Sequence, residues 1–336
     1  MPESFTWLDG ERLIRFARGA LGEARDLVEA RGLVTYTLLT TPRGREADAT
    51  LAGHAAAVLD VPAGRVDEVS GELRGRVRGG AVVALGGGRV VDTAKAIAGA
   101  DGLACAAIPT TLSGAELTGF HRLPAGASGG RLVRPSLVVA DPALMASQPM
   151  PDLVASAMNA LAHAVEALYT PLANPVAEMA ALHAAELLAA GVRHEPEPER
   201  DDLALGALLA GYASGLTGYA VHHVVCQTIV RVCGTPHAQT NAVVLPHSVR
   251  LMVDRAPHEI GRLARALGVG GEGAAAAPEL VAGLVGRAGV STLSDLGVTE
   301  ESIPAVVQAV APRPELQNMP RPPGAAELRA LVESAL

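Results

Sequence analysis

The chain has 336 residues and a formal net charge of −8, with no basic block along its length. This charge argues against nucleic acid and anionic membrane as partners. Nearly half of the residues are apolar, which is typical of a globular core and not of a disordered chain. The start of the sequence is polar and acidic, so we expect no signal peptide. The sequence has no run of about 18 uncharged apolar residues, so we expect no membrane-spanning helix. The three cysteines form no CxxC pair, so we expect a reducing, cytoplasmic setting.

The first 150 residues alternate between helical and strand patterns. Helical spacing covers residues 12–30, 47–58, 66–77 and 89–98. Short apolar segments predict strands at residues 33–40, 81–85, 104–108 and 136–140. Such strands between helices are typical of a parallel sheet covered on both faces. We therefore expect a Rossmann-like α/β domain over residues 1–150, which would bind a dinucleotide.

The pattern changes after Pro151, where no further strand is predicted. Helices are expected at residues 153–170, 175–190, 203–216, 221–232 and 241–253, and in later stretches up to residue 336. Residues 270–278, rich in Gly and Ala, predict a turn, and the proline-rich residues 312–323 predict a surface connector. The predicted fold class is therefore α/β followed by all-α, with residues 151–336 as a helical substrate and catalytic domain.

A glycine run directly follows the strand at 81–85. Gly86, Gly87 and Gly88 lie between a strand and a helix, where backbone N–H groups can approach a phosphate and the helix dipole favours an anion. A tight structural turn would use the same glycines. Thr110 and Thr111 follow the next strand directly, at the edge where open α/β sheets bind ligands. Their hydroxyls favour the interpretation as a nucleotide site.

Lys95, near the end of the helix that follows the glycines, is the only lysine in the chain. The other 26 of the 27 Lys and Arg positions are arginine. A compact ammonium suits a place where a planar guanidinium does not fit. We expect Lys95 beside a phosphate, a ribose or a reacting group.

Together these motifs resemble the iron-containing alcohol dehydrogenase superfamily, which has a dehydroquinate-synthase-like fold. The resemblance extends from about residue 12 to the C-terminus. It rests on residues 86–95, 108–111, 158–169, 236–237, 245–247 and 318–322. The maleylacetate reductase branch is most similar, because of the short loop 110–116, the pair Met158–Asn159 in place of Met-Asp, and the segment 222–226.

The resemblance implies that NAD(H) or NADP(H) binds in a cleft between the two domains. Gly86, Gly87 and Gly88 would hold the pyrophosphate. The residues implied near ribose and nicotinamide are Asp92, Lys95, Thr110 and Thr111. Thr41 stands where the family usually has an acidic residue near the adenosine ribose, with Arg43 and Arg45 close by. A 2′-phosphate would be tolerated there, so the choice of cofactor stays open.

The resemblance also implies an altered metal site. Alcohol dehydrogenases of this family hold a divalent metal with one Asp and three His. The matching positions here are Asn159, His163, Gln227 and His237. Two of the four are neutral amides, which are poor substitutes for carboxylate and imidazole ligands. We therefore expect no metal cofactor.

Without a metal, hydrogen-bond donors must polarise the substrate. The resemblance makes His163 or His237 the proton donor, assisted by the amides of Asn159 and Gln227. His222 and His223 are adjacent on a helix, so only one of them can face the site, and we take His223 as a substrate contact.

Arginines are candidates for binding a substrate carboxylate. Arg231, Arg131 and Arg134 are possible, and only Arg231 lies in the segment that departs from the family pattern.

The leading hypothesis is a metal-independent NAD(P)H-dependent reductase of an activated alkene or carbonyl, acting on a small unsaturated oxo-acid. Gln227 and Arg231 leave open a non-redox descendant, a lyase, dehydratase or cyclase that uses the same interdomain cleft. An inactive scaffold is disfavoured by the retained histidines and Lys95, and a conventional metal-dependent dehydrogenase by the missing ligands. The resemblance further implies a homodimer.

Overall fold

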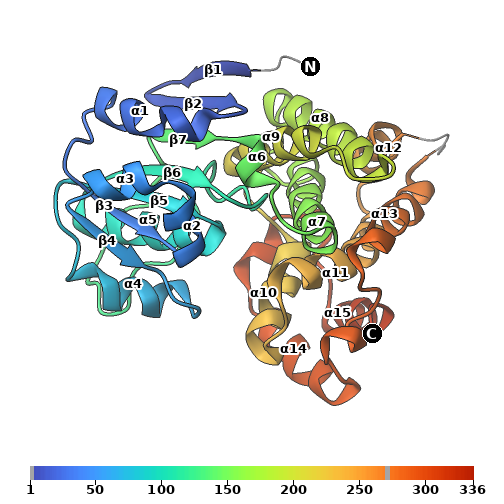
Figure 1. The fold of residues 1–336 in the computed structure, drawn as a ribbon. Coiled ribbons are helices and arrows are strands. Elements are labelled where there is room, and N and C mark those ends of the chain that lie inside the picture. Colours follow the sequence, from blue (N-terminus) through green and yellow to red (C-terminus); the bar gives the residue numbers. More distant parts are fainter. Residues whose placement is uncertain (1–3, 269–272) are drawn as a thin grey trace. The chain divides into compact units, whose positions relative to one another are not determined.

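The structure is a computed structural model that describes residues 4–268 and 273–336 (Figure 1). The chain divides into two compact units, with the division between Ser147 and Gln148.

A seven-stranded sheet forms the centre of the described part of the first unit, in the order β1-β2-β7-β6-β5-β3-β4 (Figure 1). The strands are β1 (Ser4–Asp9), β2 (Arg12–Ala17), β3 (Tyr36–Thr40), β4 (Ala57–Asp60), β5 (Ala81–Gly86), β6 (Ala104–Pro109) and β7 (Leu137–Ala140). All neighbours pair in parallel except β1, which is antiparallel to β2. The expected parallel sheet is confirmed, with an antiparallel strand at one edge.

Helices cover both faces of this sheet because its central strands are apolar on both sides. Along β5, Val82 and Ala84 pack in one core with α4 (Val66–Arg74) and α5 (Gly88–Asp101), whereas Val83 and Leu85 pack in a second core with α1 (Ala24–Ala30) and α3 (Ala49–His54). This alternation is the period of two that a strand imposes on its side chains. The helical elements of this unit are η1 (Ala20–Glu23), α1 (Ala24–Ala30), α2 (Pro42–Ala47), α3 (Ala49–His54), α4 (Val66–Arg74), α5 (Gly88–Asp101) and α6 (Pro142–Met145).

The order of the strands reverses between β3 and β5. The chain leaves β3 toward β4 on one side, and it leaves β5 toward β6 on the other. Ligands of open parallel sheets bind at such a switch point, outside the carboxyl ends of the strands. The glycine run follows β5 and therefore lies at this point.

Two helix predictions in the first unit are wrong in part. Residues 12–17 form strand β2 instead of a helix, and Ile14 and Phe16 are buried whereas Leu13 and Arg15 between the buried positions are not. Pairing with β7 outweighs the helical spacing there. The helix expected at 47–58 ends at His54, and its last residues belong to β4. Of the residues in this edge strand only Leu59 is buried, so no alternating signal marked it.

The second unit is built from helices, and residues 148–268 and 273–336 contain no strand, as predicted. The longer helices are α7 (Met150–Ala167), α8 (Pro175–Arg193), α9 (Arg200–Thr217), α10 (Val221–Cys233), α11 (His237–Met252) and α12 (Pro257–Ala266). Shorter elements follow: η2 (Ala274–Ala276), α13 (Ala277–Val285), η3 (Gly286–Ala288), η4 (Ser294–Leu296), η5 (Glu300–Ser302), α14 (Ile303–Val310), η6 (Pro314–Gln317) and α15 (Ala325–Ser334).

Helix α7 forms the centre of this unit and packs against α8, α9 and α11. Small residues allow the neighbouring helices to approach closely. A Cβ on Gly206 of α9 would lie only 2.8 Å from Cγ of Leu188 on α8. The scarcity of aromatic residues, 2% of the chain, fits this close packing.

Two further predictions concern connections. Of the predicted turn at 270–278, residues 270–272 lie outside the described residues, and residues 274–278 form η2 and the start of α13. The predicted connector at 312–323 contains η6, and its Leu316 and Met319 are buried. This segment is therefore anchored in the unit by its apolar side chains.

Among the described residues, α8 is long and apolar enough to cross a membrane by composition. Half of its apolar window is buried inside the protein, against α7 and α9. Helices α9 and α10 pass the same test only together, and a bend of 102° separates them. Burial of this kind is what a core helix shows.

Candidate active site

The glycine run forms a cradle between β5 and α5. Gly86 ends β5, Gly87 is the N-cap of α5 and Gly88 is its first residue. A Cβ on Gly87 would lie 3.0 Å from Cγ2 of Thr111, so a side chain there would crowd the loop after β6. The first N–H groups of a helix have no partner within the helix. The cradle therefore fits a pyrophosphate held by backbone N–H groups.

The predicted hydroxyl residues lie at the same edge of the sheet, on the strands next to β5. The Thr110 N–H donates to the Gly86 carbonyl at 3.1 Å. On the other side Thr41 directly follows β3, and its Oγ1 accepts the Gly44 N–H at 3.2 Å, which caps α2. The arginines near Thr41 already have protein partners: Arg45 pairs with Asp60, and Arg43 donates to Ser147.

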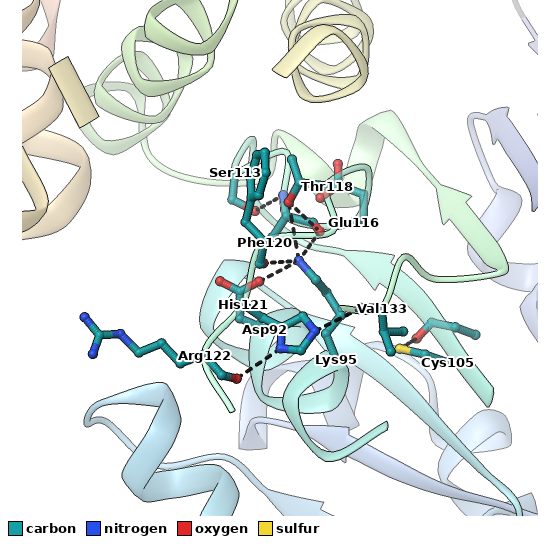
Figure 2. Close-up of polar contacts among 12 residues, drawn as sticks. Asp92, Lys95, Cys105, Ser113, Glu116, Thr118, Phe120, His121, Arg122 and Val133 are labelled. Atoms are coloured by element: carbon teal, nitrogen blue, oxygen red, sulfur yellow. Dashed lines mark hydrogen bonds and ion pairs between the residues drawn. The ribbon is translucent and has the colours of Figure 1, made fainter. Parts of the chain in front are cut away.

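Lys95 holds a loop in place instead of pointing to solvent (Figure 2). Its fully buried Nζ donates to Oδ1 of Asp92 at 2.9 Å. It also contacts the loop after β6, through the Ala115 carbonyl at 2.9 Å, the Phe120 carbonyl at 2.7 Å and Oγ1 of Thr118 at 3.4 Å. An ammonium has three protons, and these acceptors use all of them. The sequence suggested a place beside the ligand, but any effect of Lys95 on a ligand must pass through Asp92 and this loop.

The same loop carries a carboxyl group that the sequence did not single out. Glu116 is fully buried, and neither of its carboxyl oxygens has a hydrogen-bond partner among the described residues. Burial raises the pKa of Glu116 from 4.5 to about 7, against the opposing charges of Lys95 and Arg12. Cys105 on β6 is also buried, which raises the pKa of its thiol to about 12 and makes it unreactive.

In the second unit, one face of α7 carries three polar side chains. Asn159, His163 and Glu166 stand at positions i, i+4 and i+7, a spacing that places them on one face. Asn159 and Glu166 are buried. Oδ1 of Asn159 has no hydrogen-bond partner within the part of the chain that the structure describes.

The adjacent histidines at the start of α10 differ in their contacts. Both ring nitrogens of His222 are engaged, Nδ1 with Oγ of Ser248 at 2.9 Å and Nε2 with Oδ1 of Asn241 at 3.0 Å. Nδ1 of His223 lies 2.6 Å from Oε2 of Glu166, whereas its Nε2 has no hydrogen-bond partner among the described residues. Burial lowers the pKa of both rings, so both are neutral near pH 7.

The ring of His223 stacks on that of His163. The ring centroids are 4.0 Å apart and the planes are inclined by 19°. Helices α7 and α10 thus meet at two imidazoles, and His223 is the member of the adjacent pair with an available nitrogen. His237 is the exposed first residue of α11, and its electrostatic interaction with His223 also lowers the pKa of that ring.

A guanidinium group lies next to Gln227, one turn beyond His223 on α10. Nη2 of Arg313 donates to Oε1 of Gln227 at 3.2 Å and pairs with Glu315 at 2.9 Å. Glu315 in turn accepts the hydroxyl of Tyr219 at 3.0 Å. The ion pair of Arg313, the N-cap of η6, and Glu315 thus lies at the polar face of α10.

The structure thus brings Asn159, His163, His223 and Gln227 to the facing sides of α7 and α10. Arg231 is exposed in the last turn of α10, one turn beyond Gln227 and about two turns beyond His223. The sequence analysis missed Glu166 and Arg313. The helical spacing from Asn159 could have found the first, but Arg313 is 86 residues from Gln227 and nothing in the sequence links them.

Two family models match this chain. One, described as the C-terminal part of the iron-containing alcohol dehydrogenase family, matches residues 153–336, and one described as iron-containing alcohol dehydrogenase matches residues 15–121. The chain belongs to the iron-containing alcohol dehydrogenase family. The resemblance that the motifs suggested is confirmed, and the chain is an oxidoreductase.

Individual relatives agree with this assignment. Maleylacetate reductase 1 from Rhodococcus opacus is 33% identical, over 98% of this chain and 96% of its own length. The crystal structure of maleylacetate reductase from a Rhizobium species superimposes with a TM-score of 0.84 at 29% identity, covering 100% of this chain and 99% of that one. Sulfoacetaldehyde reductase from Bifidobacterium kashiwanohense, solved in complex with NAD+, gives 0.78 at 25% identity and covers 96% of each chain.

The metal of iron-containing alcohol dehydrogenases does not fit the residues at its positions here. Asn159 and Gln227 offer only neutral amide oxygens, and that of Gln227 accepts a hydrogen bond from the Arg313 guanidinium. That oxygen is therefore already engaged by an arginine, which is itself paired with Glu315. Among the described residues, no group of three or more His, Cys, Asp or Glu side chains is placed to hold a metal ion.

Proposed function

We propose that this member of the family is a metal-independent, NAD(P)H-dependent reductase of an activated alkene or carbonyl, with a small unsaturated oxo-acid such as maleylacetate as substrate. The contact between Arg313 and Gln227 carries the proposal, because it occupies the amide oxygen that would have to serve as a metal ligand. The curated relatives named maleylacetate reductase support the substrate class.

The cofactor would be held at the carboxyl edge of the sheet. Gly86, Gly87 and Gly88 with the start of α5 would bind the pyrophosphate. Contacts to ribose and nicotinamide would come from Thr41, Asp92, Thr110 and Thr111, with Lys95 keeping Asp92 in place. When bound, NAD(P)H supplies the hydride. The NAD+ complex of the sulfoacetaldehyde reductase supports this choice of cofactor.

The residues on α7 and α10 would handle the charge and the proton. Addition of a hydride to an alkene conjugated with a carbonyl places negative charge on the carbonyl oxygen. The amide groups of Asn159 and Gln227 can donate hydrogen bonds to that oxygen. His163 or His237 would supply the proton, and His223 would contact the substrate.

A substrate carboxylate requires a cation. Arg231, the candidate from the sequence, lies one turn beyond Gln227 on α10 and is exposed, whereas Arg313, although paired with Glu315, contacts Gln227 directly. We therefore propose Arg313 as the carboxylate contact. Substitution Arg313→Lys, which removes the planar fork, should raise KM for an oxo-dicarboxylate at least about tenfold, and Arg231→Ala should not. The opposite result would return this role to Arg231.

The test of the proposed function begins with a fluorescence titration of the purified protein with NADH and NADPH. We expect binding of at least one in the micromolar range, followed by turnover with maleylacetate that a chelator does not diminish. Absence of binding at millimolar cofactor would overturn the proposal. Turnover that disappears with chelator and returns with one equivalent of Fe(II) or Zn(II) would overturn the metal-independent part.

We further propose that the protein is a homodimer and that it works in the cytoplasm. Light scattering on the purified protein tests the dimer. The two cysteines buried in the structure, Cys105 and Cys226, and the partly buried Cys233 are all free thiols, which suits a reducing compartment.

A further inference from the structure

The side chain of Glu166 makes two kinds of hydrogen bond: one oxygen caps helix α10, and the other contacts the ring of His223. Helix α10 begins at Val221 with Ala220 as its N-cap, and an alanine has no side-chain acceptor for the first N–H groups. Oε1 of Glu166 accepts the His222 N–H at 2.7 Å and the His223 N–H at 3.4 Å. A carboxylate from α7 therefore caps α10 from outside the helix.

The other oxygen of the same carboxylate binds the side chain of His223. Oε2 lies 2.6 Å from Nδ1, and both residues are buried, with 0% and 4% of their side chains exposed. Burial raises the pKa of Glu166, but its Oε1 already accepts two backbone N–H groups of α10. A protonated carboxyl would need an acceptor, so this environment favours the carboxylate.

A carboxylate can only accept a hydrogen bond, so Nδ1 of His223 must carry the proton. In a neutral imidazole the other nitrogen then bears the lone pair. Nε2 of His223 has no hydrogen-bond partner among the described residues, although it is buried. The ring is also held from the side by its stack on His163. Its orientation and its tautomer are therefore both fixed.

We propose that Glu166 is a positioning residue that fixes His223 as the Nδ1–H tautomer, so that the lone pair of Nε2 is presented to the bound ligand. The ligand group that fits is a hydrogen-bond donor, such as the hydroxyl of an enol or of a hydroxy acid. Only the expected effect on kcat rests on the proposed function. The hydrogen bonds that fix the tautomer belong to the chain itself.

The substitution Glu166→Gln separates the two tasks of this residue. The amide oxygen of the new side chain can still accept the N–H groups of α10. Its NH2 group would face Nδ1 and donate to it, which moves the proton of His223 to Nε2. We expect a small change in melting temperature and a fall of about 10²–10⁴-fold in kcat, with the Kd for NADH changed less than about twofold.

Nitrogen NMR of protein labelled with 15N-histidine reports the tautomer without any turnover. The signal of His223 is assigned by its loss in His223→Asn. In the wild type we expect Nε2 of His223 to be unprotonated, and in Glu166→Gln we expect it to carry the proton. The matched control is Glu116→Gln, an equally buried glutamate of the first unit, which should leave the His223 signal unchanged.

The outcomes distinguish this inference from the proposed function. A wild-type His223 that carries its proton on Nε2, or a tautomer unchanged in Glu166→Gln, would overturn the inference even if the protein reduces maleylacetate. Inversion of the tautomer with the expected fall in kcat supports it. If Glu166→Gln fails to fold, the wild-type spectrum alone still decides which nitrogen carries the proton.

Discussion

Glu116 should make the stability of this protein depend on pH in an unusual direction. Its carboxyl is fully buried with no hydrogen-bond partner among the described residues, and burial raises its pKa from 4.5 to about 7. Below pH 4.5 both the folded and the unfolded chain hold this proton. Between pH 4.5 and 7 the unfolded chain releases it while the folded chain keeps it. The contribution of Glu116 to the free energy of unfolding therefore falls as pH rises through this window.

The size of the effect follows from the pKa difference. Each pKa unit corresponds to about 1.4 kcal/mol, so a rise from 4.5 to about 7 amounts to about 3 kcal/mol. The variant Glu116→Gln keeps the shape and cannot ionise. Relative to the wild type, it should gain up to about 3 kcal/mol in unfolding free energy between pH 4.5 and pH 8. Any constant cost of burying the amide cancels in this difference.

The assay is urea unfolding followed by circular dichroism at pH 4.5, 6 and 8, for the wild type and for Glu116→Gln. Glu46→Gln serves as control, because Glu46 lies exposed on α2 in the same unit. The control should have the same pH dependence as the wild type. If the unfolding free energies of Glu116→Gln and the wild type change in parallel with pH, the reasoning about burial is wrong.

Three further substitutions test the other parts of the site. Lys95→Met leaves Asp92 and two loop carbonyls without their cation, so the free energy of unfolding from a thermal melt should fall by about 3–5 kcal/mol. NADH binding should weaken as well. The control Arg25→Met, at an exposed position, should change neither quantity. Gly88→Ala places a Cβ 2.9 Å from the Cβ of Ser113, so NADH binding measured by fluorescence should weaken at least about tenfold. The control Gly22→Ala adds a Cβ in open space and should leave NADH binding unchanged. The double variant Asn159→Asp/Gln227→His restores the family's ligand types. Measured by calorimetry, it should bind Zn(II) more tightly than the wild type. Equal affinities would show that the type of ligand does not limit metal binding.

The sequence was sufficient to predict which edge of the sheet carries the residues proposed to bind the cofactor. The strands near residues 40, 86 and 109 were recognisable, and parallel strands bring their carboxyl ends to one edge. The edge strands β1 and β4 were not predicted, because short edge strands derive their structure from pairing with a neighbouring strand.

The helical part of the site was predictable only in part. The spacing of Asn159 and His163 indicated a shared face of α7. Which of the two adjacent histidines on α10 has an available nitrogen depends on Ser248 and Asn241, two side chains that reach His222 from α11. The cation at Gln227 comes from Arg313, and only the tertiary fold brings it there.

Lys95 also determines how this protein behaves toward amine-reactive reagents. The ε-amino group of the only lysine is fully buried and bonded to α5 and to the loop after β6. In the folded protein such a reagent can reach only an α-amino group, so a dye or a surface can be attached at one defined point. The lysine reacts only when the loop opens, and the rate of its modification therefore measures the opening of this loop directly.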